Sequence, residues 1–214
     1  MNPRFEEYLG AAEAIARAGG EVLLEWQPRL RSVEPERKGR PTELVTAADR
    51  ATEHVVVSAL LERFPDHAVL AEEGVLTPVG RASQTSDHLW IIDPLDGTTN
   101  FVHGLPHFAV SIGLEVDDTP VLGVVYDPCK DELFTAIVGL GAWVGDRSLR
   151  VSSAATLDTA LVCTGFPTDP AARAVAFARA ARVLQAARGL RRTGSAALDL
   201  AYVAAGRLDG FWEY

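Results

Sequence analysis

A chain of 214 residues with 48% hydrophobic and 23% charged side chains has the composition of a globular protein, which excludes a disordered chain. Its 29 acidic residues outnumber 20 basic ones and give a net charge of −9, which argues against a nucleic-acid groove because such grooves gather Lys and Arg. Two cysteines, Cys129 and Cys163, are too few for a disulfide framework and indicate free thiols in a reducing compartment.

The first residues of the chain argue against secretion. Glu6 and Glu7 stand where a signal peptide would need basic residues. No stretch approaches the roughly 18 uninterrupted apolar residues of a membrane span. We therefore expect a soluble cytoplasmic protein with no membrane association.

The N-terminal third predicts two helices separated by a loop. Apolar residues repeat at every third or fourth position over 5–26, and Pro28 ends this helix. Residues 29–41 are polar and basic without periodicity, which predicts a mobile loop. A second helix is expected over 46–64, where Thr46 begins a stretch with capping-box spacing.

The middle and the C-terminal third differ in pattern. Short apolar and β-branched segments separated by turn residues predict strands over 68–71, 88–92, 108–116, 121–126, 132–138 and 142–144, mostly as an antiparallel meander. Further on, strands at 161–164, 190–193 and 208–212 alternate with helices at 170–188 and 194–205. This pattern predicts an α+β half over 1–151 and an α/β half over 152–214 that share an interface.

The most informative segment begins at Asp93, directly after an apolar strand. Asp96 follows a Pro-Leu pair, so both carboxylates can face one space. Gly97, Thr98 and Thr99 then offer small side chains and consecutive amides suited to an anion. Carboxylates beside such amides suit hard cations held between protein and phosphate. Asp-Pro and Asp-Gly are also common turn dipeptides, but their position after a strand favours the site.

Four other charged residues are weaker candidates. Glu72 and Glu73 follow the predicted strand 68–71, and a solvated turn is the alternative for an isolated acidic pair. A second acidic cluster at the end of another strand favours a shared sheet edge instead. Taken alone, Asp49 is typical of an acidic charge that stabilises a helix N-terminus. Lys38, taken alone, is typical of a solvated surface charge.

These motifs together resemble those of the inositol monophosphatase family of magnesium-dependent phosphatases. The Asp93–Phe101 segment resembles the family signature, and the match extends over essentially the whole chain. The other matching segments, in family order and spacing, are Lys38, Leu44–Asp49, Glu72–Gly74, Phe101–Gly113 and Arg192–Glu213. The last of these is similar to bacterial inositol-1-monophosphatases in particular.

The resemblance implies a fold and an activity. The fold would be a layered αβαβα sandwich of the sugar-phosphatase type, combining α+β and α/β parts. The activity would be a Mg²⁺-dependent, lithium-sensitive phosphomonoesterase that hydrolyses myo-inositol monophosphate, a phosphorylated polyol, to inositol and phosphate. Two to three Mg²⁺ ions and a homodimer are implied as well.

The resemblance also assigns roles to residues. The metal ligands would be Glu72, Asp93, the carbonyl of Leu95, and Asp96. Glu72 would position and deprotonate the attacking water with the help of Thr98, itself hydrogen-bonded to Asp49. The phosphate would be bound by Gly97, Thr98 and Thr99. The alcohol would be contacted by Asp96, Gly194, Ser195, Ala196 and Glu213. Lys38 and Glu73 would act behind these ligands.

The family pattern continues after Glu213 with a Trp-Asp pair whose aspartate completes the second metal site, whereas this sequence stops at Tyr214. We therefore expect an incomplete C-terminal part, and water in place of that ligand would weaken the second cation. Two alternatives remain open. The same chemistry could act on histidinol phosphate, fructose 1,6-bisphosphate or 3′-phosphoadenosine nucleotides, or the protein could be a regulatory binding protein that keeps the phosphatase fold.

Overall fold

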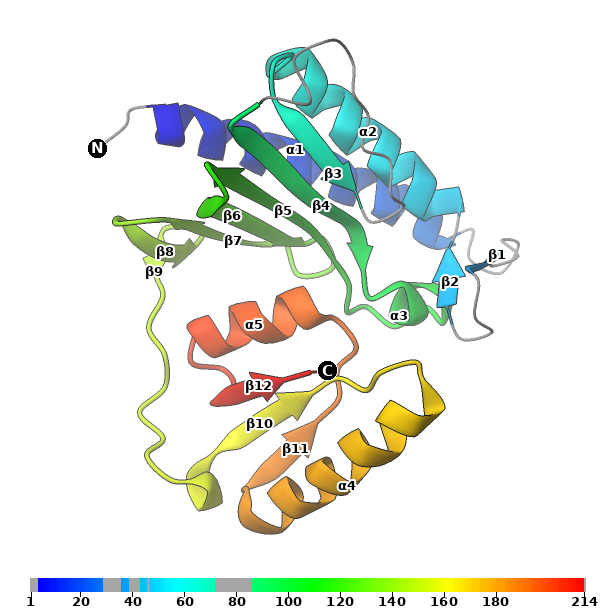
Figure 1. Cartoon of the computed structure of the whole chain (residues 1–214), viewed down its shortest axis with the longest axis vertical. Helices are drawn as coiled ribbons and strands as arrows, with labels where there is room; N and C mark the ends of the chain where they lie inside the picture. Colours follow the sequence, from blue (N-terminus) through cyan, green and yellow to red (C-terminus); the bar gives the residue numbers. More distant parts are fainter. Residues whose placement is uncertain (1–3, 29–35, 39–42, 46, 72–85, 214) are drawn as a thin grey trace.

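The computed structural model describes residues 4–28, 36–38, 43–45, 47–71 and 86–213. These residues stack in five layers, in the order helices, sheet, helix, sheet, helix (Figure 1). The predicted αβαβα sandwich is therefore confirmed. The two sheets lie on either side of the predicted boundary at residue 151, while the division of the chain into two units stays a prediction.

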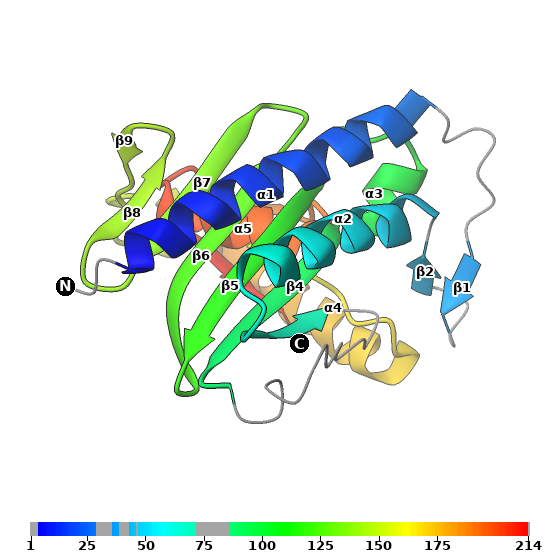
Figure 2. The same cartoon turned by 90° about the horizontal axis from the view of Figure 1, so that it is seen from above.

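Two helices, α1 (Arg4–Trp26) and α2 (Ala47–Arg63), form the first layer and lie side by side across one face of the large sheet (Figure 2). The apolar repeat of α1 faces inward, with Leu23 fully buried. At Gly20 a Cβ atom would lie 2.5 Å from the ring of Tyr126, so glycine lets the helix approach the sheet closely. Both predicted helices are confirmed.

The segment between these helices contains a small hairpin. Strand β1 (Glu36–Lys38) pairs antiparallel with β2 (Glu43–Val45), and β2 contacts helix α3 (Thr98–Val102) (Figure 1). The prediction of an unstructured loop over 29–41 is therefore wrong at 36–38. Strands of three residues are too short for an alternating pattern to appear in the sequence.

The large sheet has the strand order β3-β4-β5-β6-β7-β8-β9, parallel between β3 and β4 and antiparallel elsewhere. The strands are β3 (Ala68–Ala71), β4 (His88–Asp96), β5 (Ala109–Val116), β6 (Thr119–Asp127), β7 (Glu132–Ile137), β8 (Gly141–Val144) and β9 (Arg147–Ser148). The predicted meander is confirmed. Strand β4, however, continues to Asp96 rather than ending at residue 92.

One corner of the core is built from aromatic rings and two histidines. The indole Nε1 of buried Trp90 donates a hydrogen bond to Nδ1 of His67 at 3.0 Å, and the rings of His67 and His88 stack with their centroids 4.4 Å apart. Burial lowers the pKa of His67 from 6.5 to about 4, and the neighbouring His88 adds to this shift. His67 is therefore neutral at pH 7.

This histidine should make stability depend on pH. Because the folded pKa lies below the unfolded one, the unfolded chain binds the extra proton, so stability is complete above about pH 6.5 and falls as the pH drops toward 4. We expect a loss of about 1 kcal/mol, less than the full linkage value because solvent screens the half-buried ring. Urea unfolding at pH 7 and pH 4.5 should show a smaller pH dependence for His67→Gln than for wild type. Equal pH dependence would contradict this assignment.

The small sheet is parallel, with the order β11-β10-β12. Helix α5 lies between the two sheets, and α4 covers the outer face (Figure 1). The elements are β10 (Leu161–Thr164), α4 (Pro170–Ala186), β11 (Gly189–Arg191), α5 (Ala196–Ala204) and β12 (Gly210–Trp212), and a 3₁₀ turn (Leu157–Thr159) precedes β10. Every strand and helix predicted here is confirmed, with ends that differ by at most two residues.

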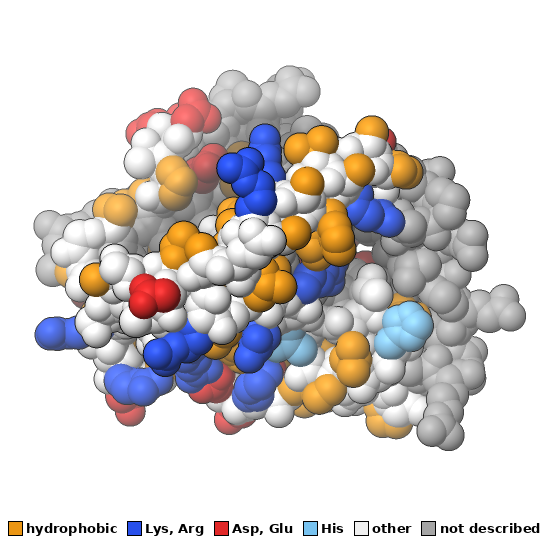
Figure 3. All heavy atoms as spheres, turned by 90° about the horizontal axis from the view of Figure 1, so that it is seen from below, with side chains coloured by type: hydrophobic (Ala, Val, Ile, Leu, Met, Phe, Trp, Pro, Cys, Tyr) orange, Lys and Arg blue, Asp and Glu red, His pale blue; other side chains and the backbone are white. Residues whose placement is uncertain are grey.

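Helix α4 is held to the small sheet by small side chains. Only Ala176 and Ala180 are fully buried, while Val175, Phe177 and Leu184 are exposed. Basic and hydrophobic side chains are visible on the face of the molecule seen from below (Figure 3). Alanine contacts let the helix lie close to the sheet but leave most of its surface in solvent. In the part of the chain that is described, no helix is both long and apolar enough to cross a bilayer.

Candidate metal and phosphate site

The site begins at a bulge in strand β4. Asp93 pairs with Ser111 and Asp96 with Ala109, so β4 advances three residues where β5 advances two. An extra residue of this kind bends a strand and redirects its side chains. The bulge also tolerates Pro94, which cannot donate to the ladder. The prediction that Asp93 follows the end of the strand is therefore corrected: both aspartates belong to the bulged end of β4.

Hydrogen bonds hold the bulge in one conformation. The amide of Leu95 donates to Oδ1 of Asp93 at 3.0 Å, and the Leu95 side chain is buried. The hydroxyl of Thr98 donates to the Leu95 carbonyl at 3.1 Å. A carboxylate, a carbonyl and a hydroxyl thus gather at one turn. The resemblance also implies a hydrogen bond between Thr98 and Asp49, and that bond stays a prediction.

The short helix α3 starts directly after Asp96. Gly97 has φ = +97°, and a Cβ there would lie 3.0 Å from the carbonyl oxygen of His107, so this position needs glycine. Thr98 and Thr99 form the first turn of the helix, where amides have no intrahelical acceptor. Thr99 is exposed and Thr98 is partly buried. The predicted phosphate-binding residues therefore form one turn beside the two aspartates.

Asp96 joins this turn to helix α5. Its Oδ2 accepts hydrogen bonds from the Ser195 hydroxyl at 2.5 Å and the Ala197 amide at 2.7 Å, and its Oδ1 accepts one from the Ala196 amide at 3.3 Å. Carboxylates are stabilised at helix N-termini. Ser195 also caps α5 by accepting a hydrogen bond from Leu198 at 3.3 Å. Three of the predicted substrate-binding residues thus lie together.

The other predicted alcohol-binding residues follow parallel strands of the small sheet. Glu213 comes directly after β12, and Gly165, which was not among the predicted residues, comes directly after β10. A Cβ on Gly165 would overlap the carboxylate of Glu213, so glycine leaves that space to the acid. Gly194, which follows β11, has φ = +97°. Because the carboxyl ends of parallel strands meet at one edge, these residues share an edge of the small sheet.

The surroundings of Asp96 and Glu213 disfavour the charged forms of both acids. Burial raises the pKa of Asp96, and the hydrogen bonds from α5 partly oppose that rise. Burial also raises the pKa of Glu213, Arg192 lowers it, and the charge of Asp96 adds to the rise. Acids in such surroundings are stabilised by a nearby cation.

Several predicted residues are not placed at the site by the structure. Glu72 and Glu73 lie outside the described residues, and Lys38 is described only as part of strand β1. Asp49 is in the first turn of α2 and is fully buried, unlike an ordinary solvated helix-end charge. Among the residues that the structure does describe, no three His, Cys, Asp or Glu side chains form a ready metal cluster.

Sequence reasoning missed polar residues that support the site from within. Asp199 is buried and accepts hydrogen bonds from the Thr193 hydroxyl at 2.5 Å and the Cys163 thiol at 3.2 Å. Asn100 is also buried and contacts both parts of the chain. The sequence did contain a feature that could have indicated Asn100 as a residue of the site. It is one of only two asparagines in the chain, and it directly follows the Gly-Thr-Thr turn.

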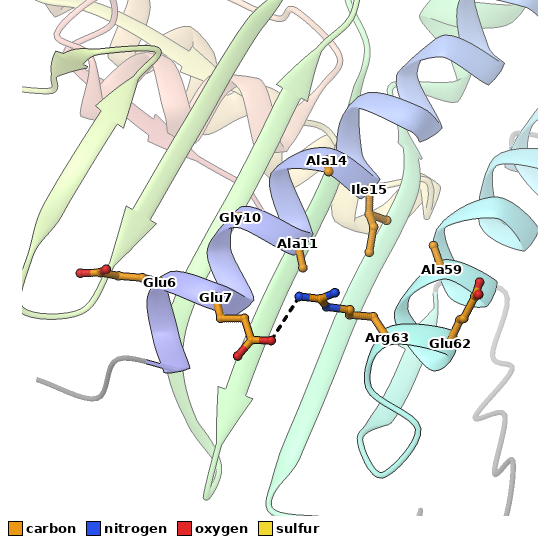
Figure 4. Close-up of a pocket in the computed structure, with 9 residues that line it drawn as sticks. All are labelled: Glu6, Glu7, Gly10, Ala11, Ala14, Ile15, Ala59, Glu62 and Arg63. Atoms are coloured by element: carbon orange, nitrogen blue, oxygen red, sulfur yellow. Dashed lines mark hydrogen bonds and ion pairs between the residues drawn. The ribbon is translucent and has the colours of Figure 1, made fainter.

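A separate groove of about 700 Å³ lies between helices α1 and α2 (Figure 4). It is lined by small residues of α1, including Gly10 and Ala14, and by acidic residues such as Glu62. Arg63 and Glu7 form an ion pair across it at 3.2 Å. None of the predicted site residues lines this groove, so it does not belong to the candidate site.

Both aspartates lie at the bulged end of β4, and Asp96 accepts hydrogen bonds from the start of helix α5. This layered fold is that of a phosphatase family. The chain belongs to the inositol monophosphatase family, whose model matches residues 5–214. It is 43% identical to the inositol-1-monophosphatase of Synechocystis sp. over 205 residues, which cover 95% of this chain and 69% of that protein.

Two further relatives carry another name. The Nus factor SuhB of Pseudomonas aeruginosa is 43% identical over 211 residues, covering 96% of this chain and 76% of that protein. The crystal structure of the extragenic suppressor protein SuhB from Bartonella henselae superposes with a TM-score of 0.90 at 40% identity, covering 97% of this chain and 78% of that one. The chain is thus similar to relatives that carry two different names, and it shares its fold with the Bartonella henselae protein.

Proposed function

We propose that the chain is a Mg²⁺-dependent phosphomonoesterase that hydrolyses myo-inositol monophosphate to inositol and phosphate. The observation that carries this proposal is the position of Asp96. Its carboxylate belongs to the bulge beside the phosphate-binding turn, and it is held by Ser195 and the amides of α5, where the alcohol is predicted to bind. We therefore propose that this one residue lies between the binding sites of the two parts of a phosphoester.

The residues at the bulge fit magnesium by their chemistry. Asp93, the carbonyl of Leu95 and Asp96 offer only oxygen atoms, which Mg²⁺ prefers. The raised pKa of Asp96 indicates a carboxylate whose charge a cation would stabilise. We propose that these groups and Glu72 hold two to three ions. Bound Mg²⁺ supplies charge neutralisation for the phosphoryl group and lowers the pKa of an attacking water.

The protein would bind the ester and direct the proton transfer. We propose that the amides of Gly97, Thr98 and Thr99 hold the phosphate oxygens. Glu72 would take a proton from the attacking water, with Thr98 and Asp49 orienting it and Lys38 and Glu73 supporting the ligands. Gly194, Ser195, Ala196 and Glu213 would hold the hydroxyls of the alcohol, so that the ester bond faces the water in line.

A panel of phosphoesters at fixed Mg²⁺ concentration tests the substrate. We expect the highest kcat/KM for myo-inositol 1-phosphate, compared with histidinol phosphate, fructose 1,6-bisphosphate and 3′-phosphoadenosine nucleotides. A clearly higher value for another ester would overturn the inositol assignment. EDTA should abolish turnover, Mg²⁺ should restore it and Li⁺ should inhibit it; turnover that survives EDTA would overturn the metal assignment.

A regulatory binding protein is the second candidate, because the 43% identical relative from Pseudomonas aeruginosa is named a Nus factor. The site residues favour catalysis, since a pure binding protein needs no aspartates beside an amide turn. A genetic test separates the two functions: a cellular role that survives Asp93→Asn would not depend on catalysis. The resemblance also leads us to propose a homodimer, which light scattering would check.

A further inference from the structure

Asn100 connects the two parts of the chain through its side-chain amide. It lies in helix α3, is 5% exposed, and its Nδ2 donates hydrogen bonds to the carbonyl of His107 at 2.7 Å and to the carbonyl of Thr193 at 2.8 Å. His107 precedes β5 in the large sheet, whereas Thr193 follows β11 in the small one. Both hydrogens of one amide are thus used to bridge the two sheets.

The chain beyond Thr193 packs directly against this amide. Gly194 has φ = +97°, and a Cβ there would lie 2.9 Å from Nδ2 of Asn100. The next residue, Ser195, donates to Asp96 and begins helix α5. Residues 193–197, here called the alcohol loop, are therefore fixed at one end by Asn100 and at the other by Asp96.

We propose that Asn100 is a positioning residue that sets the alcohol loop relative to the phosphate-binding turn, and thereby the recognition of the leaving alcohol. This inference rests on the proposed function. Asn100 belongs to the same short helix as Thr98 and Thr99, so its distance from the phosphate-binding turn is fixed covalently. Removing the amide also breaks the bond to the His107 carbonyl, which belongs to the same part of the chain as Asn100, so the only bond lost between the two parts is the one to the alcohol loop. Removal of the amide should therefore weaken recognition of the alcohol rather than binding of the phosphate.

The direct test is Asn100→Asp, which keeps the shape but turns two donors into an acceptor facing two carbonyls. We expect kcat/KM for myo-inositol 1-phosphate to fall ~10- to 100-fold, mainly through KM. p-Nitrophenyl phosphate carries the same phosphate on an alcohol without ring hydroxyls. The factor by which its kcat/KM falls should be smaller by about tenfold or more. Asn100→Ser is the second variant, should the aspartate prevent folding.

A matched control variant sharpens the comparison. Thr52→Val is the matched control, because Thr52 is a buried polar residue of helix α2, which lies on the opposite face of the large sheet from α5 (Figure 1). The control should leave the ratio of kcat/KM for the two esters unchanged. Equal losses on both esters in the Asn100 variants, or no loss on either, would overturn the proposal.

Hydrogen exchange gives a readout that does not depend on turnover. The amides of Ala196 and Ala197 donate to Asp96, and they should exchange faster in Asn100→Asp than in wild type or Thr52→Val. Unchanged exchange in residues 193–199 would contradict the positioning role. If wild type hydrolyses neither ester, the proposed function fails, while the exchange measurement still decides whether Asn100 holds the loop.

Discussion

Asp93→Asn is expected to lower kcat/KM by about 10³-fold or more while leaving the fold intact. The reason is that the two functions of this side chain can be separated. Its Oδ1 accepts the Leu95 amide and thereby holds the bulge, and an asparagine oxygen can make the same bond. The negative charge that we propose holds a divalent cation is lost. The Mg²⁺ concentration for half-maximal activity should rise in parallel.

The matched control for this prediction is Asp118→Asn. Asp118 is an exposed residue with φ = +57° between β5 and β6, a conformation that asparagine tolerates well. It undergoes the same chemical change far from the bulge, so activity and melting temperature should stay at wild-type values. Steady-state kinetics with a Mg²⁺ titration and thermal unfolding check both variants. An Asp93 variant that keeps more than about a tenth of wild-type activity would contradict the metal-ligand role.

The elements that could be predicted from the sequence are those whose burial leaves a local pattern. The inward face of α1 repeats every three or four residues because one side of the helix packs on the sheet. The strands from β5 to β8 alternate or run apolar because they pack against helices and are separated by tight turns. Period and turn residues together were sufficient to predict the meander.

The register of β4 could not be predicted in this way. Pro94 and the two aspartates look like the end of a strand, because proline and acids are depleted in strands. Only the ladder to β5 shows that the strand continues through a bulge to Asp96. A bulge depends on the partner strand, and the partner is not visible in a local segment.

Some residues of the candidate site could likewise be predicted from a local pattern, and others could not. Asp93, Asp96 and Gly97 are neighbours in the sequence, so the predicted cluster follows from one short motif. The bond from Asn100 to Thr193 joins residues 93 positions apart, and no composition or periodicity indicates such a contact. Contacts between the two sheets are set by how the layers stack, which is a property of the whole fold.

Gly97→Ala is expected to lower kcat/KM by about 100-fold and to reduce the free energy of unfolding by about 2–4 kcal/mol. A side chain at φ = +97° is strained, and the new Cβ would lie 3.0 Å from the His107 carbonyl oxygen and 3.2 Å from the Cα of Phe108. Backbone atoms cannot turn aside as a flexible side chain can. The start of α3 must therefore shift, and the amides proposed to bind the phosphate shift with it.

The control Gly139→Ala separates strain from contact. Gly139 has φ = +78°, but among the described residues no atom lies within 4 Å of the place that a Cβ would take, so alanine there should cost only about 1 kcal/mol and leave kinetics unchanged. Urea unfolding measures both losses, and the inhibition constant of inorganic phosphate measures the amide turn directly. That constant should rise in Gly97→Ala alone. If it stays at the wild-type value while stability falls, Gly97 supports the fold but the amides beside it do not bind the phosphate.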